Sequence, residues 1–292
     1  MKITEAFERG EFVVTAEVGP PKGFHIEKML EEARTYLSGI TAVNVTDNQS
    51  SVMRLGSLAT CKALKDEGLT PIFQMTCRDR NRIALESDLL SAALFGIENL
   101  LLLTGDHTKL GDHPQAKPVF DLDSVSLIHT VKQLESGVDL GGNELVGEPP
   151  KFAKGAVVSP CSDSLDAQLA KMERKVAAGA EYFQTQAVYE PEKFIQFMEK
   201  AKQFGKPVQL GIVIPKSVGM CRYMNANVAG IHIPEEMIAE LKADKEKTKA
   251  GITGVEIAAR VIRECKPYCQ GVHIMAMGWE SKVPALLEQA GI

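Results

Sequence analysis

The sequence predicts an α/β fold, a single-domain (β/α)8 TIM barrel over residues 1–292. Short apolar runs alternate with longer amphipathic ones from the first residues to the last, a pattern typical of parallel strands joined by helices. The repeating unit averages roughly 36 residues, and eight such units fill 292 residues, as a closed barrel requires. An open doubly wound sheet, the main alternative, would need a switch point and rarely uses eight such regular units.

Eight apolar runs are expected to form the strands of the barrel. In chain order they cover residues 12–18, 42–46, 71–76, 99–104, 155–159, 182–188, 208–214 and 271–277. Amphipathic patterns at 26–37, 52–68, 80–96, 124–137, 164–179, 191–205, 235–243, 254–265 and 282–291 are expected to form the helices between them. Several of these patterns end in glycine, the usual helix stop.

Two segments depart from this regular alternation. Residues 137–153 are rich in glycine and proline, and we expect an irregular excursion on the bottom face of the barrel, before the fifth strand. Residues 215–234, after the seventh strand, are too many for a simple turn and are expected to help build the site.

Composition and charge exclude several classes of partner. The net charge is -5, so no basic excess is available to neutralise a nucleic acid backbone. The N-terminus lacks the apolar core of a signal peptide, and no stretch approaches the length of a membrane span. We therefore expect a cytoplasmic protein. No metal site is expected, because His107 and His113 have no third ligand at a suitable spacing.

Polar residues gather where the predicted strands end, which is where a barrel of this type builds its active site. Glu17 and Asp106 are carboxylates with apolar residues leading into them, a setting that raises a carboxyl pKa toward that of a useful acid. Gln74 and Gln186 interrupt apolar runs, where a ligand could satisfy their amides, and Gln184 lies with Gln186 at the end of the sixth strand. The alternatives are a surface carboxylate for Glu17, a helix cap for Asp106 and a satisfied core amide for Gln186.

Five motifs at successive strand ends resemble the methylenetetrahydrofolate reductase family. They are TAEVGPP, VNVTDNQ, QMTC, LLLTGD and RKVAAGAEYFQTQ, in this order and at barrel spacing. The resemblance extends over residues 12–291. It implies an oxidoreductase acting on CH-NH donors, which uses a flavin at the barrel mouth to reduce 5,10-methylenetetrahydrofolate to 5-methyltetrahydrofolate.

The resemblance also implies roles for individual residues. Glu17 matches the general acid, and Asp106 matches an aspartate that lies beside both the flavin and the pterin. Gln186 matches a pterin-binding glutamine, with Gln184 as a second substrate-binding candidate beside it. The positions that match flavin-binding residues are Thr46, Asn48, Gln74, Thr104, Gly105, Asp106, Arg174 and Lys175.

Two departures from the family pattern widen the expected set of cofactors and partners. The segment SPCSDS at 159–164 is shorter than the loop that holds adenosine in relatives and lacks their histidine, so FMN is an alternative to FAD. Gly219 stands where some relatives carry a phenylalanine that packs against nicotinamide. Electrons would then come either from NADH or from a reduced iron-sulfur partner subunit, and we expect an oligomer or a heteromeric complex.

Two other functions remain compatible with the sequence. A folate-dependent methyltransferase barrel would also bind a pterin at its mouth, but it would need no flavin. A flavin- or folate-binding subunit could instead serve mainly as a docking partner in a larger electron-transfer complex.

Overall fold

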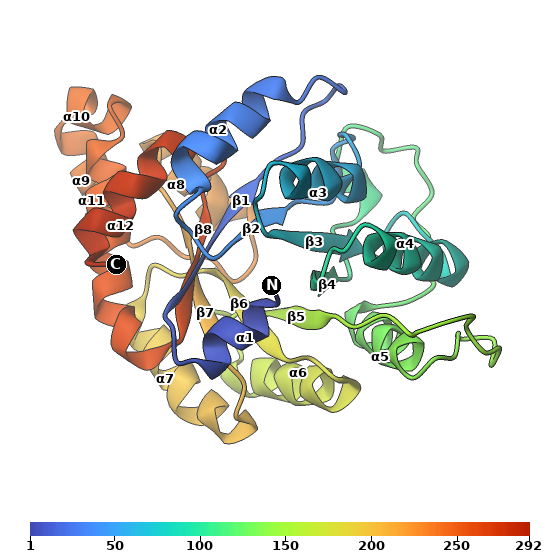
Figure 1. Ribbon diagram of the computed structural model, residues 1–292. Coiled ribbons are helices and arrows are strands. Elements are labelled where there is room, and N and C mark those ends of the chain that lie inside the picture. The colour runs from blue at the N-terminus through green and yellow to red at the C-terminus, as the bar shows by residue number, and fades with distance from the viewer.

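The computed structural model describes all 292 residues as a closed barrel of eight parallel strands, arranged in chain order (Figure 1). This confirms the predicted fold. The strands are β1 (Val13–Val18), β2 (Ala42–Val45), β3 (Pro71–Thr76), β4 (Asn99–Leu103), β5 (Ala153–Val158), β6 (Tyr182–Ala187), β7 (Val208–Val213) and β8 (Gly271–Met275). β1 pairs with both β2 and β8, which closes the barrel. Strand ends differ from the predicted ends by at most two residues.

Helices surround the barrel and return the chain from the end of each strand to the start of the next (Figure 1). They are α1 (Ile3–Glu8), α2 (Glu27–Leu37), α3 (Ser57–Asp66), α4 (Arg82–Leu94), α5 (Ser124–Glu135), α6 (Leu165–Ala178), α7 (Pro191–Ala201), α8 (Val218–Asn227), α9 (Glu235–Ala243), α10 (Lys245–Lys249), α11 (Ile252–Cys265) and α12 (Val283–Ala290). None is long and apolar enough to cross a membrane.

Three helices were not expected from the sequence. α1 and α10 are only six and five residues long, too short for a periodic pattern to stand out. α8 lies in the stretch 215–234 and begins at a Ser217 N-cap, whose Oγ accepts a hydrogen bond from the backbone N–H of Met220. Residues 137–152 contain no helix or strand, apart from one isolated bridge between Val138 and Glu144.

The apolar core has two parts. A large cluster of 63 buried residues fills the space between the strands and the surrounding helices. A smaller cluster of eight lies inside the N-terminal end of the barrel: Ile3, Ala6, Val13, Ala42, Ile72, Leu101, Ala153 and Tyr182. α1 contributes two of these residues and is tied down by a 2.7 Å hydrogen bond from the Ile3 N–H to Asn99 Oδ1. The barrel thus has a filled apolar floor, and polar interior residues lie above it.

Candidate active site

A layer of hydrogen-bonded polar side chains lies directly above the apolar floor. Asn44 Nδ2 donates to Gln184 Oε1 at 2.9 Å, and Gln184 Nε2 donates to Gln209 Oε1 at 3.0 Å. Thr15 Oγ1 lies 3.1 Å from Gln209 Nε2 and 3.3 Å from Gln184 Nε2. All four side chains are almost completely buried. The carboxamide of Gln184 therefore makes its hydrogen bonds inside the barrel and has no free group to offer a substrate.

Glu17 lies one step further toward the barrel mouth than Thr15, because residues two apart on a strand point to the same side. It is only 9% exposed. Its Oε1 accepts a 3.0 Å hydrogen bond from Gln74 Nε2 and lies 3.4 Å from His273 Nε2. The other ring nitrogen of His273 is 2.9 Å from Thr15 Oγ1. Glu17 therefore lies inside the barrel and is held there by other interior side chains. The alternative, a carboxylate on the protein surface, does not describe this residue.

Gln186 follows Gln184 on β6, two residues closer to the C-terminal end of the strand. Its side chain is half-buried, and its carboxamide makes no hydrogen bond to the protein. A satisfied core amide would have such partners, so a polar ligand is the better interpretation of this glutamine.

The turn after β4 carries three of the predicted residues. Gly105 has φ +92°, and a Cβ atom there would lie 3.0 Å from the Cβ of Thr76, so only glycine fits without strain. Thr104 Oγ1 accepts a hydrogen bond from the Ser124 N–H. Asp106 is exposed and caps no helix, since Asp123 is the N-cap of α5. The turn thus presents a free carboxylate at the mouth.

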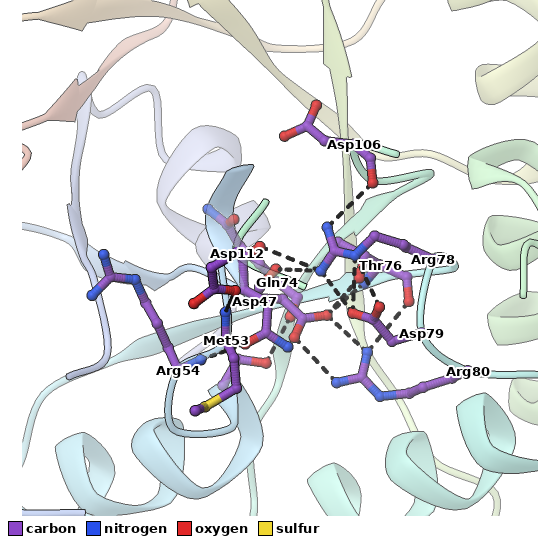
Figure 2. Close-up of polar contacts among 12 residues, drawn as sticks. Asp47, Met53, Arg54, Gln74, Thr76, Arg78, Asp79, Arg80, Asp106 and Asp112 are labelled. Carbon is purple, nitrogen blue, oxygen red and sulfur yellow. Dashed lines mark hydrogen bonds and ion pairs between the residues drawn. The ribbon is translucent and has the colours of Figure 1, made fainter. Parts of the chain in front are cut away.

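An ion-pair network joins the ends of β2, β3 and β4 (Figure 2). Both carboxylate oxygens of Asp47 accept hydrogen bonds from Arg80, at 2.7 and 3.1 Å, and Thr76 donates to Asp47 through its N–H and its hydroxyl. Burial alone would raise the pKa of Asp47, but the Arg80 ion pair and the Thr76 hydrogen bonds outweigh it and lower that pKa. The carboxylate therefore stays ionised.

Arg78 extends the same network toward β4. It is 1% exposed, and it forms an ion pair with Asp79 at 2.7 Å. Its remaining contacts are with the backbone carbonyls of Asn48 at 3.3 Å and of Asp47 and Asp106, each at 3.5 Å. Figure 2 shows the Asp106 carboxylate directed away from Arg78. Arg78 therefore positions the β4 turn without neutralising the charge of Asp106.

The loop after β2 has an unusual backbone. Asn48, Ser50 and Ser51 have φ values of 46°, 56° and 59°, in the left-handed region that costs a non-glycine residue of order 1–3 kcal/mol. Asn48 Oδ1 accepts a 2.9 Å hydrogen bond from the Arg54 N–H, which helps to hold the loop. A Cβ atom at Gly111 would overlap the Ser51 carbonyl, so the loops after β2 and β4 are in close contact. Backbone strain of this kind is common where a loop approaches a ligand.

Three buried hydroxyl groups have no hydrogen-bond partner in the protein: those of Thr46, Thr108 and Ser162. They follow β2, β4 and β5, all at the C-terminal ends of the strands. A buried polar atom without a hydrogen-bond partner costs about 1–3 kcal/mol of stability. A polar ligand bound near the ends of β2, β4 and β5 could supply the missing partners. Thr46 is among the residues predicted to bind a flavin.

The predicted basic pair lies on α6, beside the end of β5. Arg174 is exposed, whereas Lys175 is partly buried and its Nζ donates to the carbonyl of Val157 at 2.6 Å. Burial, with the nearby charges of Lys171 and Arg174, lowers the pKa of Lys175 to about 8. A bound anion would stabilise the charged form of this lysine, so the pair fits the phosphate of a flavin.

His273 and Arg78 were not among the predicted site residues. His273 interrupts the apolar run GVHIM, the same signal that identified Gln74, and that signal could have found it. Arg78 lies in the polar turn CRDR, where nothing distinguishes a buried arginine from a solvated one.

Comparisons with known proteins identify the family of this chain. The family model described as methylenetetrahydrofolate reductase matches residues 2–291. Methylenetetrahydrofolate reductase 2 of Schizosaccharomyces pombe is 25% identical over 81% of this chain, which spans only 38% of that protein. The 5,10-methylenetetrahydrofolate reductase of Salmonella typhimurium is 24% identical, over 87% of this chain and 82% of its own length.

Solved structures agree on the fold. An uncharacterized protein from Clostridium thermocellum, which binds two copies of 5-methyl-5,6,7,8-tetrahydrofolic acid, superposes with a TM-score of 0.68 at 14% identity, over 99% of this chain and 98% of that one. A 2,3-dimethylmalate lyase gives a TM-score of 0.53 at 13% identity, over 99% of this chain and 87% of that one. Because the family model covers nearly the whole chain, the protein belongs to the methylenetetrahydrofolate reductase family.

Proposed function

We propose that this protein is a flavin-dependent methylenetetrahydrofolate reductase, which converts 5,10-methylenetetrahydrofolate to 5-methyltetrahydrofolate. The observation that carries the proposal is Glu17, a carboxyl group only 9% exposed and held by Gln74 at the mouth of a barrel of this family. A buried carboxyl group of this kind is suited to donate a proton to a bound substrate.

The residues proposed to hold the flavin are Thr46, Asn48, Gln74, Thr104, Gly105, Asp106, Arg174 and Lys175. The unpartnered hydroxyl of Thr46 and the positions of Arg174 and Lys175 support this set. When bound, the flavin would supply the hydride. FAD is the expected form and FMN the alternative, with NADH or a reduced iron-sulfur partner subunit as the source of electrons.

Glu17 would protonate the nitrogen that leaves when the five-membered ring of the substrate opens. Opening produces an iminium carbon that can accept hydride, so the proton must be delivered before reduction. Gln186, with its free carboxamide, would bind the edge of the pterin. Asp106 would lie between pterin and flavin at the rim, where its free carboxylate can accept hydrogen bonds from either.

A basic cavity at the rim suits the glutamate end of the folate. The cavity has a volume of about 370 Å³, lies beside the end of β7 between α8, α9 and α10, and has no acidic side chain in its lining. Its cationic residues are Lys216, Arg222, Lys242, Lys245 and Lys249. Folates carry carboxylates on the end opposite the pterin, and these cations would attract them.

The substitution Glu17→Gln tests the proposed acid. The amide keeps the shape of the side chain but cannot donate a carboxyl proton, so folate reduction should fall about 100- to 10,000-fold. Flavin content and reduction of the flavin by the electron donor should change little, and both can be followed by visible absorption. Glu32→Gln, on the outer helix α2, is the matched control and should behave like the unmodified protein. Normal folate turnover in Glu17→Gln would refute the acid role.

Two further measurements separate the alternative functions. A purified chain that shows no flavin absorption after reconstitution would favour the methyltransferase barrel. Activity with an artificial donor but not with NADH would favour a subunit that depends on an electron-transfer partner, and rapid oxidation of NADH by the isolated chain would contradict that dependence.

A further inference from the structure

We infer that the buried amide layer of the barrel fixes the tautomer of His273, and that His273 thereby places the transferable proton of Glu17 on Oε2, the oxygen that has no partner in the protein. The inference about the proton rests on the proposed acid role of Glu17. In this arrangement His273 is a positioning residue, which orients the acid and gives up no proton of its own.

The chain of hydrogen bonds begins at two backbone carbonyls. Gln209 Nε2 lies 3.3 Å from the carbonyl oxygen of Val13 and 3.2 Å from that of Val272. A carbonyl oxygen can only accept a hydrogen bond, so the NH2 end of the Gln209 amide must face this pair. Gln209 Oε1 then accepts from Gln184 Nε2, and Gln184 Oε1 accepts from Asn44 Nδ2. The backbone thus sets the orientation of all three amides.

The oriented amides determine where the Thr15 hydroxyl hydrogen points. Thr15 Oγ1 faces the NH2 groups of Gln209 at 3.1 Å and Gln184 at 3.3 Å, and an amide NH2 group cannot accept a hydrogen bond. Its own hydrogen is therefore directed to its remaining neighbour, His273 Nδ1, at 2.9 Å. Nδ1 accepts that hydrogen bond, so it carries no proton, and the proton of the neutral imidazole is on Nε2.

The same logic continues to the carboxyl group of Glu17. Its Oε1 accepts a 3.0 Å hydrogen bond from Gln74 Nε2 and lies 3.4 Å from His273 Nε2, within ion-pair distance. An oxygen that faces two donors is the acceptor oxygen, so the proton of the acid form belongs on Oε2, which has no hydrogen-bond partner in the protein. His273 is the one titratable side chain within ion-pair distance of Glu17, and it is 3% exposed.

Protonation of His273 would disrupt this arrangement. A proton on Nδ1 would place two donors against each other unless the Thr15 hydroxyl turned, and Gln209 and Gln184 already occupy the directions it would turn toward. The geometry therefore favours the neutral ring with its single proton on Nε2.

The test reads the tautomer directly, by nitrogen NMR of the full chain with ¹⁵N-labelled histidine. The chain has six histidines, and the His273 signals are those lost in His273→Gln. We expect a bare Nδ1 and a protonated Nε2 from pH 6 to 8. A protonated Nδ1, or a doubly protonated ring, in the unmodified protein would overturn the inference. This measurement requires no turnover, so it tests the tautomer of His273 independently of the proposed reductase activity.

Kinetics then test the consequence for Glu17. Thr15→Val removes the hydroxyl with little change in shape, so Nδ1 loses its donor and the tautomer is no longer fixed. We expect folate reduction to fall about tenfold and its pH profile to shift, with flavin reduction by the donor within about twofold of normal. Thr60→Val, a buried threonine of α3, is the matched control.

The conservative variant distinguishes positioning from packing. Glutamine at position 273 can still present an N–H near Glu17, whereas leucine of similar volume cannot. His273→Gln should therefore retain clearly more folate reduction than His273→Leu, while both bind flavin. Equal loss in the two variants, or no loss in Thr15→Val, would mean that the chain of hydrogen bonds serves the stability of the barrel and does not position the acid.

Discussion

The two sides of the barrel mouth differ in how their charges are balanced. At the ends of β2 to β4, Asp47 and Arg78 are buried and Arg80 is partly buried, and all three are paired with partners in the protein. Beyond β6 and β7, the carboxamide of Gln186 has no partner, and the cations Lys242 and Lys245 form no ion pair. The charges of the Asp47 network are thus balanced within the protein, whereas the cations beyond β7 are free to meet a charged ligand.

Burial explains this difference. A buried charge without a partner is costly, so the cluster around Asp47 must be satisfied before any ligand arrives. An exposed lysine stays hydrated and costs little when unpaired, so the rim near β7 can keep its cations free. We infer that the β2 to β4 side is a preformed support for the flavin, and that the β6 to β8 side gains its contacts when the folate binds.

The largest expected effect is on stability and concerns Asp47. Asp47→Ala removes an acceptor shared by Arg80 and Thr76 and leaves a partly buried guanidinium with only Asp88 as an ion-pair partner. The free energy of unfolding should fall by about 3 kcal/mol, as expected when one partner of a buried pair is removed. Urea unfolding, followed by circular dichroism, measures this loss.

A surface ion pair provides the matched control for that experiment. Glu256 pairs with Lys247 at 2.7 Å, but both side chains are about 40% exposed. Glu256→Ala should cost less than about 1 kcal/mol. If the two variants lost similar stability, the contrast between the two sides of the mouth would not be energetic in origin.

The sequence predicts the framework of the site because each element depends on a local pattern. Each strand is an apolar run, and strand periodicity puts Glu17 and Gln74 on the interior face where they meet. The sequence does not distinguish the depth of Gln184 from that of Gln186. They lie two residues apart on β6, and the register of β6 against β7 shifts between Gln184 and Ala187, an irregularity that periodicity does not predict.

The support of the acid could not be derived from local patterns. Thr15 and His273 are 258 residues apart and meet only because β1 pairs with β8 when the barrel closes. Likewise, Asp47 reads as a polar strand-end residue, and its ion pair with Arg80 depends on the path of the turn after β3. Closure and turn geometry are properties of the whole fold, which single-sequence periodicity does not encode.

A smaller effect is expected from the free cations at the rim. The double variant Lys242→Gln and Lys245→Gln should raise the KM for the folate about fivefold with little change in kcat, because partly screened charge pairs to the substrate are lost. The difference from the unmodified protein should shrink as the salt concentration rises. Steady-state kinetics at low and high ionic strength measure both effects.

The control for this variant removes the same charge elsewhere. Lys28 on α2 and Lys200 on α7 are exposed and lie outside the basic cavity. Lys28→Gln with Lys200→Gln should leave the KM unchanged. An equal rise in KM in the control would indicate that the folate is attracted by the net charge of the protein and not by the cations of the basic cavity.

The smallest expected effect concerns Lys175, whose pKa is lowered to about 8 in the folded chain, chiefly by burial. An unfolded lysine has a pKa near 10.4, so between roughly pH 8 and pH 10.4 the unfolded chain binds a proton that the native chain lacks. Raising the pH through this window should therefore increase the free energy of unfolding contributed by this residue. We expect a rise of about 0.5 kcal/mol per pH unit, below the limiting slope of ~1.4 kcal/mol for one proton.

The measurement compares urea unfolding of the flavin-free chain with that of Lys175→Met, which lacks the titrating group, and Lys28→Met serves as the exposed control. A difference between Lys175→Met and the unmodified chain that stays constant from pH 7 to pH 10 would contradict a lowered pKa. If added flavin abolishes the pH dependence, the bound anion keeps Lys175 charged, as expected of a residue proposed to hold the phosphate of the cofactor.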